Sequence, residues 1–213
     1  MRWTAHRPAG FTAVAVVAAA AAVVARQVGR HSGATAADVA RSLPGDDAVT
    51  DPTAVFDRVT TYENSPSEVW PWIAQLGKDR GGWYLPRPVA WLVPRSRQGA
   101  WAIQPELQRL TVGEVVPDWG PLPFTVHAVT AYDHLVYSAE RTDDHDSGSR
   151  PLSFSWALVL RPDGAGTRLH LRLRLRSGTA FPAVLRSLGG LVDQATVALM
   201  FAGLRQRLRP DRL

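Results

Sequence analysis

The stretch Arg168-Leu-His-Leu-Arg-Leu-Arg-Leu-Arg176 alternates leucine with arginine or histidine at every second position. Because successive side chains of a strand point to opposite faces, this pattern predicts a β-strand with one leucine face and one basic face. A half-buried antiparallel strand has this division. The leucine face must therefore meet an apolar layer. The basic face is expected to be solvated, and anionic lipid is the alternative contact.

Other strands are expected upstream of this stretch. Ser153–Arg161 is joined to it by Pro162-Asp-Gly-Ala-Gly166, a strong turn sequence, so the two segments predict a hairpin. The remaining segments rich in β-branched and aromatic residues are Ala54–Glu63, Gly113–Trp119, Phe124–Ala131 and Leu135–Arg141. Together these segments predict a largely antiparallel sheet.

Two helices have clear sequence signals. Ser65-Pro-Ser-Glu68 forms a capping box with proline at the first helical position, and it predicts a helix that Gly77 ends. Phe181–Leu208 has apolar residues at helical spacing and would extend about 42 Å, enough to cross a sheet. Gly189-Gly190 within it predicts a bend or a close approach. A further short helix is expected around Val89–Val93.

The N-terminal region divides into two parts ahead of the compact domain. Phe11–Ala25 is an uncharged apolar run flanked by arginines, so 1–26 is predicted to be a single-pass membrane anchor. A secretory signal peptide that is cleaved is the alternative. Residues 27–52 are predicted to be a flexible tether, with a short helix around Thr35–Ser42, and 53–213 to be the folded domain. Arginines on both sides of the apolar run leave the membrane orientation open.

Composition narrows the function. The chain has 213 residues, a net charge of +5 and no cysteine, which rules out disulfides and thiolate metal sites. Its six histidines have no close ligand spacing, so neither a metal nor a cofactor is expected. No nucleic-acid-binding motif accompanies the positive charge, and nucleic acid is not an expected partner.

Several segments resemble the SRPBCC superfamily, in particular bacterial polyketide-cyclase-like and lipid-transport-like members related to START and birch-pollen-allergen proteins. The segments are Ser65-Pro-Ser-Glu-Val-Trp70, Gln75-x-Gly77, Arg80-Gly-Gly-Trp-Tyr84, Pro105-Glu-Leu-Gln-Arg-Leu110 and Val112-Gly-Glu-Val-Val-Pro117. The resemblance spans roughly Ala54 to Leu208. It implies an α+β helix-grip fold in which a curved antiparallel sheet wraps a long C-terminal helix around an internal cavity. With the N-terminal segment, the expected order begins with an apolar helix.

The expected function is to bind or carry a hydrophobic small molecule or lipid in that cavity, at a membrane. Ligand sites of this kind are mostly apolar with few polar groups. The candidate lining residues come from the loop after the first helix, the strands and the last helix. They are Trp83, Tyr84, Trp119, Phe124, Phe154, Trp156, Leu171, Leu173, Leu188 and Val192.

Two other functions remain open. A cyclase-like or hydratase-like enzyme would use Asp118, Tyr137 or His127 as acid or base inside the cavity. His127 shares a strand face with Val129 and is expected to point outward, so these are weak candidates. A membrane-associated interaction module would instead present the Trp-rich segment 83–119 as an exposed aromatic patch. The identity of the ligand and the oligomeric state do not follow from the sequence.

Overall fold

The computed structural model describes residues 30–94, 98–117, 123–141, 151–177 and 183–209, with the side chains of the last helix described from Gln194. Seven strands form one sheet in the order β1-β2-β7-β6-β5-β4-β3. Every neighbouring pair is antiparallel except β1 with β2. The strands are β1 His31–Ser32, β2 Ala54–Tyr62, β3 Val115–Val116, β4 Phe124–Thr130, β5 His134–Arg141, β6 Leu152–Asp163 and β7 Gly166–Ser177.

The alternating stretch forms β7, which pairs with β2 on one side and β6 on the other along most of its length. Leu169 and Leu171 are 0% and 1% exposed, so the predicted leucine face is a core face. Glycine is required at position 166, the start of the strand, because the backbone at Tyr62 of β2 lies so close to it. A Cβ there would lie 2.2 Å from the carbonyl oxygen of Tyr62.

The helices lie on the leucine side of the sheet, which is called the inner face below. They are α3 Pro66–Ala74, α4 Arg87–Ala90 and α5 Ala183–Leu208, with a 3-10 turn at Pro105–Leu107. The predicted capping box is present, because the Ser65 amide donates to Glu68 and the Ser65 side chain accepts at the helix start. The single-turn α4 begins and ends earlier than the expected Val89–Val93.

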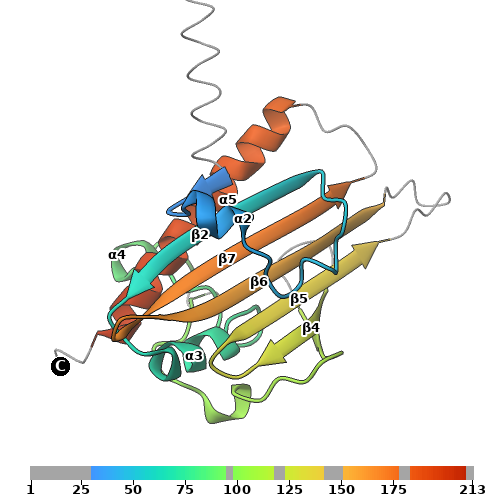
Figure 1. Cartoon of the computed structure of the whole chain (residues 1–213). Helices are drawn as coiled ribbons and strands as arrows, with labels where there is room; N and C mark the ends of the chain where they lie inside the picture. Colours follow the sequence, from blue (N-terminus) through green and yellow to red (C-terminus); the bar gives the residue numbers. More distant parts are fainter. Residues whose placement is uncertain (1–29, 95–97, 118–122, 142–150, 178–182, 210–213) are drawn as a thin grey trace, which may run out of the picture.

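The long helix α5 runs across the sheet, as Figure 1 shows. Its 26 residues include Gly189-Gly190 without interruption of the helix. The Tyr62 hydroxyl donates to the Phe201 carbonyl, joining β2 to α5. A long helix held on one face of an antiparallel sheet is the expected α+β helix-grip arrangement.

The segment 30–52 differs from the expected flexible tether. It begins with β1, the edge strand beside β2, and continues with the helix α2 Ala36–Ala40. The part after β1 packs on the face of the sheet opposite α5, called the outer face below. Leu43 and Val49 are 4% and 2% exposed, and Leu43 packs with Val136, Ala157 and Val159. This outer segment buries its few apolar residues although its sequence has no sustained apolar period.

The basic face of β7 is neither solvated nor available to lipid over most of its length, because the outer segment covers it. The Arg172 guanidinium donates to the carbonyls of Asp38, Val39 and Arg41. Arg168 pairs with Asp38, and Arg174 donates to the carbonyl of Val49. These three arginines therefore join the sheet to the outer segment through hydrogen bonds and ion pairs.

The predicted N-terminal anchor lies outside the described residues and stays a prediction. Within the ranges that the structure describes, no helix combines the length and apolar character that a membrane crossing requires.

Candidate functional site

The side chains on the inner face are fully buried at one end of the sheet, called the sealed end, and partly exposed at the other, called the open end. Along β6, Leu160 and Leu158 are 1% and 0% exposed, whereas Trp156 and Phe154 are only partly buried. The neighbouring strand β7 changes at the same level, from buried Leu171 to partly exposed Leu173 and Leu175. Trp156 is paired with Leu173 in the register, so the two strands open together.

Aromatic rings gather where the core opens. Trp156 stacks on Trp83 with centroids 5.8 Å apart and on Tyr137 at 6.1 Å. Phe124 stacks on Tyr137 at 5.6 Å and meets the edge of Phe154 at 4.9 Å. These five rings, from β4, β5, β6 and the loop after α3, are called the aromatic cluster. Since four of them keep some solvent exposure, an apolar molecule could contact them without unfolding the core.

Tyr137 is the polar group of the aromatic cluster. It is 1% exposed, and within the described part of the chain its hydroxyl has no hydrogen-bond partner. Burial raises the pKa of Tyr137 to about 12, and the opposing charges of Arg80 and Glu114 modify it less. The phenol therefore stays protonated at neutral pH and has a hydrogen-bond donor to offer, which argues against a role as general base.

The loop after α3 places the two adjacent aromatic residues differently. Trp83 is partly buried against Trp156, and its indole Nε1 donates to the Thr196 carbonyl on α5 at 3.2 Å. Tyr84 is 0% exposed, and its hydroxyl donates to the Trp72 carbonyl at 2.7 Å. Trp83 thus borders the open end, and Tyr84 belongs to the sealed core. Leu171 lies with Tyr84 on the sealed side.

The candidate acid and base residues do not come together. His127 lies at an irregularity between Val126 and Ala128, with Nε2 3.5 Å from an Asp47 carboxylate oxygen of the outer segment. The sheet therefore separates it from Tyr137. The extra residue at this bulge also turns Val129 to the inner core, so His127 and Val129 do not share a face as expected. Asp118, Trp119 and the side chains of Leu188 and Val192 lie outside the described residues.

Sequence reasoning missed a buried charge network on the outer face. Asp57 is 0% exposed, and its Oδ1 lies 2.8 Å from Nε2 of His170 and 2.8 Å from Nε of Arg172. Nδ1 of His31 lies 3.3 Å from the other carboxylate oxygen. Burial raises the pKa of Asp57, but the His170 and Arg172 contacts outweigh it and leave the pKa lowered. The sequence signal that could have predicted such pairing is the row of arginines on β7 together with the acidic residues of the outer segment.

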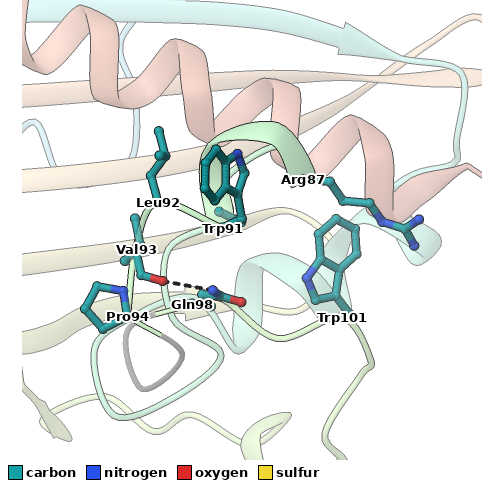
Figure 2. A pocket seen from close by; sticks show the side chains of 8 residues that line it. Arg87, Trp91, Leu92, Val93, Pro94, Gln98 and Trp101 are labelled. Carbon is teal, nitrogen blue, oxygen red and sulfur yellow. Dashed lines mark hydrogen bonds between the residues drawn. The ribbon is translucent and has the colours of Figure 1, made fainter.

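A hollow lies at the surface beside α4, with a volume of about 680 Å³. Figure 2 shows Trp91 and Trp101 on its two sides, with Arg87 next to Trp101. Trp91 and Leu92 are 74% and 67% exposed. The hollow is apart from the aromatic cluster, because none of the cluster's residues lines it. The described ranges contain no group of three histidine or acidic side chains suited to hold a metal ion.

Fold and site together define an α+β helix-grip protein with a partly open aromatic cluster on the inner face of its sheet. No family model matches the chain, and no curated protein matches it either. Solved structures that it resembles include protein MLL2253 from Mesorhizobium loti, with 21% identity, a TM-score of 0.40, and 71% of this chain and 96% of that one covered.

CalU16 from Micromonospora echinospora is another similar structure. It shares 15% identity, with a TM-score of 0.43 and coverage of 81% of this chain and 83% of that one. Ara h 8.0201 shares 11% identity, with a TM-score of 0.41 and coverage of 72% and 97%. The helix-grip description rests on the topology of this chain itself.

Proposed function

We propose that the protein binds a hydrophobic small molecule or lipid over the aromatic cluster, between the sheet and α5. The observation that carries this proposal is the change from a sealed to an open inner face at the level of Trp156 and Leu173. A core that served stability alone gains by burying both residues completely, since each buried large apolar side chain contributes about 1.5–3 kcal/mol. Partial exposure of adjacent aromatic rings is instead typical of a binding site.

The aromatic cluster also indicates the chemistry of the ligand. Its rings offer apolar area, and the Tyr137 hydroxyl offers one hydrogen bond. Leaving a buried hydroxyl unpaired costs about 1–3 kcal/mol, so a ligand with an acceptor oxygen would recover that energy on binding. The expected ligand therefore has an apolar body and one acceptor. No step of catalysis is needed to explain these residues.

Binding can be tested with the neutral apolar probe N-phenyl-1-naphthylamine. We expect saturable fluorescence enhancement, with energy transfer from Trp83 and Trp156. Phe154→Asp places a charge among the rings and should weaken binding about tenfold or more. Trp91→Ala, a change at the exposed surface, is the control and should leave affinity unchanged.

Native mass spectrometry of the purified chain supplies an independent measure. A co-purified lipid or other apolar molecule that Phe154→Asp abolishes would support the proposal. No saturable probe binding together with a ligand-free mass would overturn it.

A further inference from the structure

The surface beside α4 exposes large apolar side chains on a loop. This loop, called the Trp91 loop, comprises 85–94 and 98–101. Trp91 and Leu92 directly follow α4 and are largely exposed, whereas Ala90, the last residue of α4, is 6% exposed. Gln98 closes the loop by donating from Nε2 to the Val93 carbonyl at 2.9 Å, as Figure 2 shows.

Arg207 of α5 holds the two ends of the Trp91 loop together. Its guanidinium donates to the carbonyls of Leu85, Gly99 and Ala100 and to that of Gly203 in its own helix. Its Cζ also lies 3.9 Å from the centroid of the Trp101 ring, a cation–π contact. Both ends of the Trp91 loop are therefore bonded to the same side chain of α5.

Close packing of backbone against backbone reinforces this anchor. A Cβ on Gly203 would lie 2.2 Å from the carbonyl oxygen of Tyr84. A Cβ on Gly99 would lie 2.5 Å from that of Trp83. The glycines let the backbones of α5 and of 98–101 approach the backbone of 83–85 directly.

The charge and chemistry of the Trp91 loop identify what it contacts. None of the eight described residues that line its hollow is acidic, and Arg87 is cationic. The sequence from Gly81 to Pro105 contains arginines and no acidic residue. Tryptophan is enriched where a protein meets the headgroup level of a bilayer, and arginine is attracted to anionic headgroups by about 1 kcal/mol per charge.

We infer that the Trp91 loop docks on an anionic lipid surface, with Trp91 and Leu92 inserted at the headgroup level and Arg87 facing the lipid charge. This surface is distinct from the outer face of the sheet, where Arg168, Arg172 and Arg174 are bonded to the outer segment. It rests on different residues from the proposed ligand site, so either one can fail without the other.

The absence of cysteine from the chain allows a site-specific test on the full-length protein. Leu92→Cys and Val39→Cys each introduce one thiol for an NBD fluorophore. Val39 is also exposed, at 36%, but lies on α2 at the outer face of the sheet. Both labelled proteins are mixed with vesicles that carry nitroxide-labelled phosphatidylcholine, in two compositions: phosphatidylcholine alone, and equal parts of phosphatidylcholine and phosphatidylglycerol.

Docking predicts that the label at position 92 shifts to shorter wavelength on the anionic vesicles. Its emission there should be lower by about half or more than on the same vesicles prepared without nitroxide. The label at position 39 should change little, even if the N-terminal segment holds the protein near the bilayer. Equal quenching at both positions, or none at position 92, overturns the inference. Equal quenching of the position-92 label on both compositions overturns its anionic part. A position-92 response to protein concentration without vesicles would assign the surface to a second copy of the chain instead.

Discussion

At the scale of single residues, two buried tyrosines differ in whether the hydroxyl is hydrogen-bonded. We expect the bonded one to contribute to stability and the unbonded one to ligand binding. The Tyr84 hydroxyl is bonded to the Trp72 carbonyl, and the Tyr137 hydroxyl has no partner among the described residues. Both side chains are almost fully buried, so the comparison is matched for environment. The sequence alone could not distinguish them, because the partner of Tyr84 is a backbone oxygen placed by tertiary packing.

Phenylalanine substitution of each tyrosine tests this difference. Tyr84→Phe removes a made hydrogen bond and should lower the free energy of unfolding by about 1 kcal/mol, measured by urea denaturation. Tyr137→Phe removes an unpaired hydroxyl and should leave the stability unchanged or slightly higher. The same variant should lower the affinity for ligands that carry an acceptor oxygen and leave the affinity for a ligand without one unchanged. Equal destabilisation by both variants would show that Tyr137 has a partner and would remove it from the site.

At the scale of elements, the contact between β7 and the outer segment depends on charge. Asp57 joins β2 to His170 and Arg172 of β7, and Arg172 reaches across to the outer segment. The pKa of Asp57 is lowered despite burial, so the folded state holds the proton less tightly than the unfolded chain. The stabilisation is therefore complete above the ordinary aspartate pKa of about 4, and it is lost as the pH falls below that value.

Asp57→Asn should remove this stabilisation. At neutral pH we expect a loss of about 3 kcal/mol, because Arg172 and His170 remain buried without the carboxylate. The gap between the variant and the unmodified protein should narrow as the pH is lowered below about 4, because Asp57 of the unfolded chain takes up a proton there before Asp57 of the folded protein does. Denaturation midpoints across pH measure both effects, and Asp51→Asn in the exposed end of the outer segment is the control. A gap that is independent of pH would contradict the ionic role of Asp57.

The elements also show what could be predicted from sequence. The strand at 168–176, the capped helix after Ser65 and the long final helix carry their own periodic or capping signals, and the structure confirms them. The outer segment has no such signal, because Leu43 and Val49 are isolated apolar residues in a polar sequence. Its order comes from arginines that are far away in sequence. Charge pairing across more than a hundred residues leaves no local pattern from which the packing of 30–52 could be predicted.

The aromatic cluster could be predicted only in part, for the same reason. Phe154, Trp156 and Leu173 follow from strand alternation. Their partial exposure does not, because it depends on where α5 covers the sheet. Trp83 and Tyr84 are adjacent in a glycine-rich loop, and only tertiary contacts with Thr196 and Trp72 send one to the open end and the other into the core.

At the scale of the whole molecule, the described fold has three layers: the helices, the sheet and the outer segment. The boundary of the folded unit should therefore lie before residue 30 and not at 53. The outer segment covers Arg172, which is 3% exposed, and it completes a small apolar core with Val136 and Val159. Removing the outer segment would expose these apolar side chains. The Arg172 guanidinium would also lose its hydrogen bonds to the carbonyls of that segment.

Two truncated chains test the position of this boundary. A chain of 30–213 keeps all three layers and should unfold cooperatively. A chain of 53–213 loses the hydrogen bonds of Arg168, Arg172 and Arg174 together with the burial of Leu43 and Val49, so it should be less stable by about 4 kcal/mol or more. Guanidinium denaturation followed by circular dichroism compares the two midpoints. Equal midpoints would mean that the outer segment contributes no stability, and the folded domain would then begin at 53.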